Sequence, residues 1–370
     1  MLDYRHQLDD DLALLPPLPR HAGGQFAAIE RSRPRIRKWL NWVDETKSAD
    51  DVRTFFQKCC HDIGRRLDAT AIIQHRGDLA GSVGLTVVDR RDRAGEIGYW
   101  LAEGHEGQGV MTRAAAAMLS HGHGAMRLPR VFLCASTENP KSYSVMQRIG
   151  CTHEATLAAG DPLPDGEITD QVVYAHIDDE CGGEPIDYAL PTDRPDVRLV
   201  LQQPHHAREI FAYVDGERER LEPLLRFVER MKTVKVTRKM IRESWDMLAD
   251  ERGEVALIQR DGKIVGTVTA GGMGTVLRRA WIGYSIAAEH EGQGVASAAL
   301  RAFTRHLWAC YAKLVRLEAL LAVDNKRSLN LAEACGFRHE GTLRREFRHF
   351  GKVHDIHICG MPRPETQPTR

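Results

Sequence analysis

One stretch of this chain occurs twice, once in each half. The first copy runs from Glu96 to Val110 with the sequence EIGYWLAEGHEGQGV, and the second from Trp281 to Val295 with the sequence WIGYSIAAEHEGQGV. Each copy is a β-like run, a glycine-rich turn and an alanine-rich helical run. A helix that begins after glycines leaves its first amide N–H groups free, and its dipole adds partial positive charge there. Both copies therefore predict a site for a phosphate or pyrophosphate group.

The repeat extends over nearly the whole chain. The offset between Glu96 and Trp281 also relates His21 to His206, and it grows by one after the glycine-rich helix, as for Gly150 and Gly336. A repeat of this length indicates a duplicated domain rather than a short solenoid repeat. A chain of 370 residues is long enough for two domains, each with its own core. We predict an N-terminal domain over residues 1–180, a linker over 181–194, a C-terminal domain over 195–362 and a disordered tail over 363–370.

The predicted elements follow the same order in both halves. The first half shows helical patterns over 21–40, 49–66 and 140–150, and β patterns over 69–75, 81–89, 130–135 and 171–177. The second half shows β patterns over 255–260, 264–270, 314–322 and 354–360, and a helix over 326–336. This order predicts the α/β class, with a mixed, mostly antiparallel twisted sheet flanked by helices in each domain. Two strands of each sheet are expected to splay apart beside the glycine-rich turn.

Composition excludes several other classes of protein. The chain has 51 basic and 51 acidic residues, so its charge gives no sign of direct nucleic-acid binding. No apolar run is long enough to predict a membrane span, and the first residues lack a secretory pattern. The eight cysteines show no C-x-x-C spacing, which favours a reduced, cytoplasmic protein. The pairs His121/His123 and His354/His357 lack ligands at a zinc spacing, so no metal site is predicted.

Several motifs at fixed spacing carry a resemblance to a known family. They are the Glu-Ile-Gly-Tyr run, the glycine-rich turn, and the segments Trp39–Thr46, Thr137–Ser142 and Gly150–Leu157, with counterparts over 323–328 and 336–343. Together they resemble the GNAT superfamily of acetyl-CoA-dependent N-acetyltransferases. The branch they resemble most is RimJ/RimL, which acetylates N-terminal amines of ribosomal proteins. The resemblance covers nearly all of both halves and implies two tandem acyl-CoA N-acyltransferase domains.

The resemblance implies acetyl-CoA as the cosubstrate, with its pyrophosphate on the backbone amides of the glycine-rich turns. The family carries Gln or Arg at the first position of this turn, where both halves carry Glu. A carboxylate pointing inward would repel the pyrophosphate, and one facing solvent would not. Asn139 and Asn325 resemble the asparagine that contacts pantetheine, although helix capping explains them equally well. The predicted cofactor-binding residues are Glu106, Gly107, Gln108, Gly109, Val110, Met111, Asn139, Gly292, Gln293, Gly294, Val295, Ala296 and Asn325.

Acetyl transfer to an amine requires a base, because the amine is mostly protonated at neutral pH. The resemblance implies Glu96 as this base, and burial on its strand would raise its pKa toward a useful value. The alternative is a surface or salt-bridged glutamate. The Trp100 backbone N–H would polarise the thioester carbonyl, and Ser285 occupies that position in the second half. Ser142 and Ser328 would stabilise or reprotonate the departing thiolate. The predicted catalytic residues are thus Glu96, Trp100, Ser142 and Ser328.

The acceptor side is predicted from the segment after the first helical region. Trp39 and Trp42 are expected near a helix end and would form the wall of an acceptor pocket, although core packing explains them as well. Asp44 and Glu45 would receive a cationic amine. Cys134, on a predicted strand, is expected to be an unreactive buried cysteine.

The sequence as a whole predicts an acetyltransferase whose acceptor is a peptide or protein N-terminal amine. A small amine, such as an antibiotic or a polyamine, is the alternative acceptor, and a non-catalytic acyl-CoA- or partner-binding protein is the alternative class. The only predicted partners are acetyl-CoA and the amine, in a monomer or homodimer. Turnover is expected from the first half, because the second carries Trp281 in place of Glu96. Glu289 or Glu291 would be the substitute base there.

Overall fold

The structure is a computed structural model that describes residues 3–89, 91, 93–349 and 352–364. The chain divides into two compact units. Residues 5–188 form the N-terminal unit, whereas Asp3, Tyr4 and the residues from Ala189 onward form the C-terminal unit. The end of the predicted tail, residues 365–370, lies outside the described residues. Among the described residues, no helix combines the length and apolar character needed to cross a bilayer.

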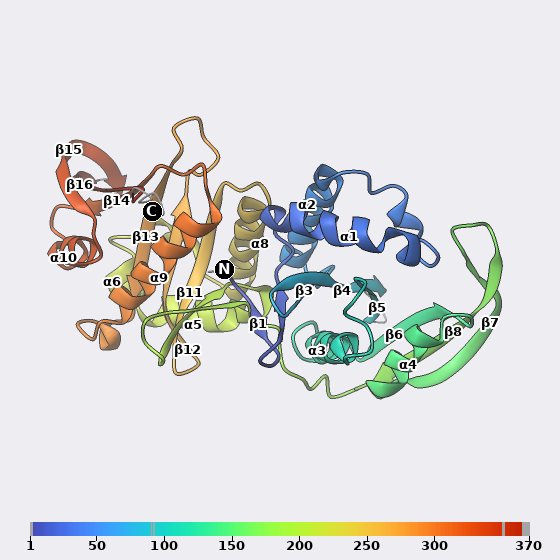
Figure 1. The fold of residues 1–370 in the computed structure, drawn as a ribbon. Coiled ribbons are helices and arrows are strands. Elements are labelled where there is room, and N and C mark those ends of the chain that lie inside the picture. The colour runs from blue at the N-terminus through green and yellow to red at the C-terminus, as the bar shows by residue number, and fades with distance from the viewer. Residues whose placement is uncertain (1–2, 90, 92, 350–351, 365–370) are drawn as a thin grey trace. The chain divides into compact units, whose positions relative to one another are not determined.

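The N-terminal unit contains an eight-stranded sheet in the order β1-β2-β3-β4-β5-β6-β8-β7 (Figure 1). Only β5 and β6 run parallel, and every other neighbouring pair is antiparallel. The strands are β1 His6–Gln7, β2 Leu12–Leu15, β3 Ala71–His75, β4 Asp78–Asp89, β5 Ala94–Leu101, β6 Arg130–Ser136, β7 Thr152–Pro162 and β8 Ile168–Ile177. The helices are η1 Pro19–His21, α1 Ala22–Ile36, η2 Asn41–Val43, α2 Ala49–Gly64, α3 Val110–Gly124 and α4 Pro140–Arg148.

The C-terminal unit repeats this topology. Its sheet order, read from β9, is β9-β10-β11-β12-β13-β14-β16-β15, and only β13 and β14 run parallel. The strands are β9 Ala189–Pro191, β10 Val197–Leu201, β11 Gly253–Arg260, β12 Lys263–Gly271, β13 Arg279–Ile286, β14 Arg316–Ala322, β15 Arg338–His349 and β16 Lys352–Pro362. The helices are η3 Pro204–His206, α5 Ala207–Gly216, α6 Arg218–Leu221, α7 Arg226–Arg230, α8 Val234–Ala249, η4 Ala288–His290, α9 Val295–Cys310 and α10 Lys326–Ala334.

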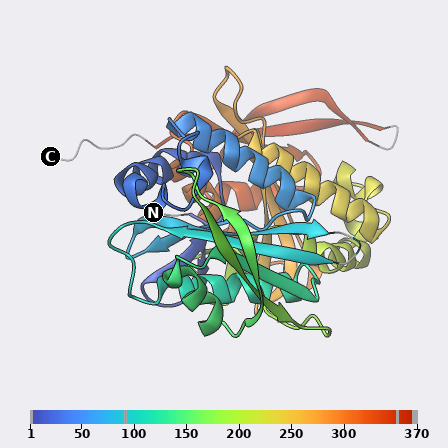
Figure 2. The ribbon, with the colours of Figure 1, turned by 90° about the vertical axis from the view of Figure 1, so that its right-hand side faces the viewer.

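The predicted α/β fold with two similar mixed, mostly antiparallel sheets is confirmed. Several strands were not predicted: the short edge strands β1, β2, β9 and β10, and the outer strands β7 and β15. Each outer strand pairs with the last predicted strand of its unit and contains two register shifts. These irregularities break the period-two pattern from which strands are recognised in a sequence. Figure 2 shows β7 and β8, in green, as a long two-stranded ribbon.

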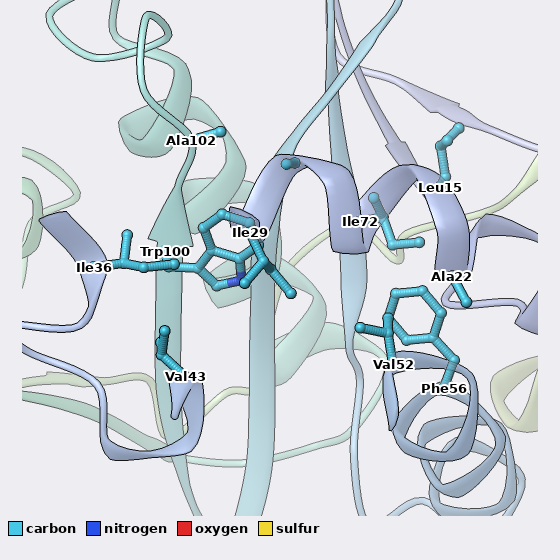
Figure 3. Close-up of a cluster of buried hydrophobic side chains, with 11 residues drawn as sticks. Leu15, Ala22, Ile29, Ile36, Val43, Val52, Phe56, Ile72, Trp100 and Ala102 are labelled. Carbon is cyan, nitrogen blue, oxygen red and sulfur yellow. The ribbon is translucent and has the colours of Figure 1, made fainter. Parts of the chain in front are cut away.

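Helices α1 and α2 cover one face of the N-terminal sheet. Trp100 of β5, which is 8% exposed, belongs to the core under these helices, and Figure 3 shows Ile29 and Ile36 of α1 and Val43 of η2 beside its indole. Side chains alternate between the two faces of a strand, so residues of β5 with even numbers, including Glu96, share the face of Trp100. This face of the sheet thus carries both the core under α1 and the predicted base.

Candidate active site

The parallel strands β5 and β6 separate partway along their length. Their register pairs run from Ala94–Arg130 to Glu96–Phe132 and then stop, although β5 continues to Leu101 and β6 to Ser136. In the C-terminal unit the pairing of β13 with β14 stops in the same way, after Ile282. The predicted splay is therefore present in both units. It leaves one row of backbone groups in each gap without a strand partner, where an extended ligand can bind.

Backbone direction determines which amides face the gap. Ala102 N–H donates to the Ala80 carbonyl at 2.6 Å, one step beyond the β4–β5 ladder. Hydrogen-bonded pairs alternate along an antiparallel ladder, so the even-numbered amides of β5 point toward β4. The Trp100 amide therefore points away from the gap, and the Tyr99 amide points into it. This corrects the prediction that Trp100 supplies the donor, since one step along a strand reverses the direction of the N–H.

The same parity holds in the C-terminal unit. Ala287 N–H donates to the Val265 carbonyl at 2.7 Å, which directs the Ser285 amide toward β12 and the Tyr284 amide into the gap. The two tyrosines occupy equivalent positions of the duplicated motif. The N–H that faces the gap therefore belongs to the repeated tyrosine in both units. It lies one residue before the predicted donor.

The glycine-rich turns have the geometry required at a helix N-terminus. Gly107 and Gly109 have φ of 72° and 70°, and Gly109 is the left-handed N-cap of α3. Gly292 and Gly294 have φ of 70° and 75°, and Gly294 caps α9 in the same way. These φ values favour glycine, because a Cβ would strain the backbone. A Cβ at Gly107 or Gly109 would have no neighbour within 4 Å, so there is open space beside the turn that leads into α3.

Glu106, at the first position of the turn, lies between two cations. Its carboxylate accepts hydrogen bonds from Arg35, at the end of α1, and from the Lys141 ammonium of α4 at 2.8 Å. Arg35 also donates to the Leu101 carbonyl at the end of β5. The carboxylate charge is thus compensated by two positive charges beside the turn that precedes α3. The predicted repulsion of a pyrophosphate is reduced accordingly.

The C-terminal unit contains the same bridge. Glu291 accepts from Arg220 at 2.8 Å and from Arg327, and Arg220 also donates to the Ile286 carbonyl. The offset of the repeat relates Arg35 to Arg220 and Lys141 to Arg327. Sequence reasoning missed all four cations. The sequence signal that could have identified them is a basic residue at the same position in both copies of the repeat.

Glu96 is half-buried on the face of the sheet that Trp100 occupies, and burial raises the pKa of its carboxyl. Within the described part of the chain, its side chain forms no hydrogen bond or ion pair. It faces Thr86 of β4 and Phe132 of β6 in register, at the point where β5 and β6 part. A carboxylate so placed is suited to accept a proton, because a raised pKa strengthens it as a base.

Cys134 of β6 is also half-buried. It comes two residues after Phe132, the register partner of Glu96. Burial, and then the charge of Glu96, raise the pKa of its thiol to about 11. A thiol of that pKa is protonated and a poor nucleophile at neutral pH.

The predicted acceptor residues lie after α1, not at its end. Trp39 is in the turn that follows α1, and Lys38 lies over its ring at 4.5 Å. Trp42 is in η2, half-buried, with its ring centroid 6.1 Å from that of Trp100. The structure therefore places Trp42 against Trp100, on the face of the sheet where Glu96 lies. Trp39 lies in the turn after α1, with its ring beneath Lys38.

Asp44 and Glu45 are exposed, and Asp44 pairs with Arg37 at 2.9 Å. Arg33 of α1 donates to the carbonyls of Val43 and Thr46, which fixes the segment between them. The acidic pair is therefore held at the surface beside η2.

Ser142 lies in the first turn of α4 and is joined to Tyr99. The Tyr99 hydroxyl donates to the Ser142 carbonyl at 2.9 Å and accepts from Ser142 Oγ at 3.3 Å. Burial raises the Tyr99 pKa to about 12, so its hydroxyl stays protonated. Asn139 caps α4, because its Oδ1 accepts from Ser142 N–H at 3.3 Å. The cap uses only Oδ1, and the Nδ2 donors are not part of it.

The C-terminal unit keeps the helix start but replaces the groups around it. Asn325 caps α10 through Ser328 N–H at 3.1 Å, and Tyr284 donates to the Ser328 carbonyl at 2.7 Å. Trp281 replaces Glu96, and its ring lies over Gly271 and Gly272. A Cβ added to Gly271 would be 2.2 Å from that ring. The indole therefore covers the region that corresponds to the base.

The acidic residue in register with Trp281 forms ion pairs with arginines. Glu318 of β14 is in register with Trp281 and pairs with Arg316 at 2.9 Å and Arg279 at 3.2 Å. Its carboxylate is thereby held by two guanidinium groups. Glu291 is likewise held by its two arginines.

Comparisons with known proteins give a family match and several relatives. A family model described as Acetyltransferase (GNAT) domain matches residues 11–152 and 197–338. A putative ribosomal N-acetyltransferase of Bacillus subtilis is 30% identical over 167 residues, covering 45% of this chain and 91% of that protein. The ribosomal-protein-serine acetyltransferase of Escherichia coli K12 is 27% identical over 173 residues, covering 47% and 96%. The spermidine N(1)-acetyltransferase of the same organism is 25% identical over 143 residues, covering 39% and 74%.

Among solved structures, Mycobacterium smegmatis RimJ in complex with CoA-disulfide is 26% identical. It covers 47% of this chain and 86% of its own length, with a TM-score of 0.43.

Proposed function

Because this chain belongs to the acetyltransferase (GNAT) family, we propose that its N-terminal unit transfers the acetyl group of acetyl-CoA to a primary amine. The observation that carries the proposal is the position of Glu96. Its half-buried carboxyl, with a raised pKa, lies where β5 and β6 part and on the face lined by Trp100 and Trp42. A base beside a gap that accepts an extended ligand is the arrangement that amine acylation requires.

Acetyl-CoA binds with its pyrophosphate on the backbone amides of 107–111, at the N-terminus of α3. The pantetheine arm lies in the gap between β5 and β6, where Asn139 Nδ2 is available to its amide groups. Arg35 and Lys141, which both form ion pairs with Glu106, supply positive charge beside the phosphates. In the C-terminal unit the corresponding ligands are the amides of 292–296 and Asn325.

In the reaction, Glu96 removes a proton from the acceptor ammonium, directly or through water, and the neutral amine attacks the thioester carbon. The Tyr99 amide donates to the carbonyl oxygen as negative charge develops on it. The attacking nitrogen then loses its second proton, the carbon–sulfur bond breaks to give the amide, and the CoA thiolate takes up that second proton, while the proton of the original ammonium passes from Glu96 to solvent. Ser142 Oγ, which donates a hydrogen bond to the Tyr99 hydroxyl at the start of α4, stabilises the departing thiolate or relays the second proton to it.

The acceptor we propose is a peptide or protein N-terminal amine. A protein acceptor is favoured by the similarity to a ribosomal N-acetyltransferase and to a ribosomal-protein-serine acetyltransferase. The exposed carboxylate of Glu45 beside η2 provides negative charge for a cationic amine, whereas that of Asp44 already pairs with Arg37. The second candidate is a polyamine, favoured by the similarity to a spermidine acetyltransferase.

The test is CoA release from acetyl-CoA, measured with N-terminal peptides and with polyamines and amino-bearing antibiotics at equal concentrations. Peptides should give the highest kcat/KM. A higher value for spermidine would replace the peptide by the polyamine. Acetyl-CoA binding without turnover of any amine would make the protein a non-catalytic acyl-CoA-binding member of the family.

A further inference from the structure

A second group of chemically active side chains lies in the C-terminal unit, away from the gap between β13 and β14. His306 and Cys310 are one turn apart on α9, with Cys310 Sγ 3.5 Å from His306 Nδ1. The carboxylate of Asp3 belongs to the same group, and its ligand atom and those of His306 and Cys310 all lie within 4.8 Å of one another. Asp3 is 3% exposed and His306 is fully buried.

A fourth residue determines how the imidazole is used. Glu254 of β11 is also fully buried, and its Oε1 lies 2.8 Å from His306 Nε2. The Tyr311 hydroxyl donates to the other oxygen of that carboxylate at 3.0 Å. A carboxylate beside Nε2 favours the tautomer with its proton on Nε2, which leaves the lone pair of Nδ1 directed toward Cys310. Metal-binding histidines in proteins have this support on the ring nitrogen that does not bind the metal.

We propose that Asp3, His306 and Cys310 bind a divalent transition-metal ion of the zinc class, and that Glu254 orients His306 for it. Zinc accepts this mixture of carboxylate oxygen, imidazole nitrogen and thiolate sulfur. Bond lengths of about 2.3 Å to sulfur and about 2.0 Å to nitrogen place two tetrahedral ligands about 3.5 Å apart. The Cys310–His306 distance is 3.5 Å. The fourth position is available to water or to the second oxygen of Asp3.

The duplication supplies an internal comparison. The repeat relates His306 to His121 on α3, whose Nδ1 accepts from Ile186 N–H at 2.9 Å. At the positions of Glu254 and Cys310 the N-terminal unit has Ala69 and Ala125. The two copies share the histidine, but the N-terminal unit has alanine where the C-terminal unit has Glu254 and Cys310. A buried histidine is therefore part of the fold, whereas the thiol ligand and the carboxylate partner of the histidine are specific to this unit.

The surroundings indicate a structural role for the ion. Tyr4 is fully buried, and its ring packs edge-on with the His306 ring, with 4.8 Å between the ring centroids. The Phe303 ring lies nearly parallel to the imidazole, with 6.3 Å between the centroids. An ion bound here connects the segment that contains Asp3 and Tyr4 to α9. The thiol of Cys310 loses its proton to solvent as the metal–sulfur bond forms, so metal uptake releases a proton.

The experiment uses the full chain after treatment with a chelator. Titration with Co²⁺ should produce thiolate-to-cobalt charge-transfer absorption, and zinc analysis after reloading should give about one ion per chain. Zinc should also raise the Tm. Cys310→Ser should abolish the absorption, whereas Cys335→Ser, which changes another buried cysteine of this unit, should preserve it.

Glu254→Gln keeps all three ligands and should weaken cobalt binding by about 10- to 100-fold, the usual effect of changing the partner of a ligating histidine. Circular dichroism establishes that each variant is folded. Absence of charge-transfer absorption in the wild type would overturn the proposal, and so would equal absorption in Cys310→Ser and Cys335→Ser.

Discussion

Glu96 is the residue on which the proposed chemistry depends most. Replacing it by Gln removes the base but preserves the shape, and general base catalysis is worth about 10²- to 10⁴-fold in rate. We expect Glu96→Gln to lower kcat by a factor in that range while the Kd for acetyl-CoA is unchanged. Steady-state kinetics and calorimetry measure the two quantities. Trp281→Ala is the matched control at the repeated position and should have little effect on turnover.

The pH dependence of turnover follows from the raised pKa of Glu96. The active form is the carboxylate, so kcat/KM should fall as pH decreases through the raised pKa, above the ordinary value of 4.5. The folded state also binds this proton more tightly than the unfolded state, so the stability contribution of Glu96 is lost as pH rises. Glu96→Gln should therefore not lower the Tm at pH 7. An unchanged acidic limb in the Gln variant would show that another group titrates.

The bridge of Arg35, Glu106 and Lys141 joins four elements: the end of α1, the end of β5, the turn before α3 and the start of α4. Arg35→Met removes one of the two cations that compensate Glu106. We expect the Kd for acetyl-CoA to rise about tenfold, equivalent to about 1.4 kcal/mol. The double variant Arg35→Met/Glu106→Gln should regain most of the affinity, because the repelling carboxylate is gone. Failure of this rescue in calorimetry would show that Arg35 acts by another route.

The turn before α3 can be tested with two variants that strain the backbone in the same way. Gly109→Val places a side chain at φ of 70°, and Gly77→Val does the same at φ of 90° in the β3–β4 turn. Both variants should lose about 1–2 kcal/mol of stability, because L-residues are disfavoured there. Only Gly109→Val should weaken acetyl-CoA binding. Equal binding by the two variants in calorimetry would argue against the α3 N-terminus as the pyrophosphate site.

At the scale of elements, the sequence predicted what depends on local pattern. Helices α2 and α4 begin at Ala49 and Pro140, where their sequence patterns predicted them. The outer strands β7 and β15 were missed because their register shifts interrupt the alternation. The amide of Trp100 was misassigned because N–H direction depends on the parity of a ladder, which no single strand reveals.

At the scale of the molecule, we expect two binding events and one productive site. Calorimetry with acetyl-CoA should show up to two sites, and Gly294→Pro should remove one without loss of turnover. Gly109→Pro should remove the other together with turnover, because only the N-terminal unit contains Glu96. Loss of turnover in Gly294→Pro alone would reverse this assignment.

The duplication predicted the whole architecture, because a nearly constant offset between equivalent residues fixes two copies of one fold. It could not predict contacts that only one copy makes. Asp3 and His306 come from opposite ends of the chain, and no motif spacing connects them. Arg35 and Glu106 meet across elements far apart in sequence, so their pairing required the structure.

The hydroxyl of Tyr213 on α5 contacts Ser285 Oγ at 2.9 Å. At the repeated positions the N-terminal unit has Ala28 and Trp100. A bulky side chain stands on the helix in one copy and on the strand in the other. Exchanging one of these residues alone between the units would leave a cavity or create a clash. Each unit therefore constrains which substitutions it can accept from the other, and a transfer between them requires a paired change.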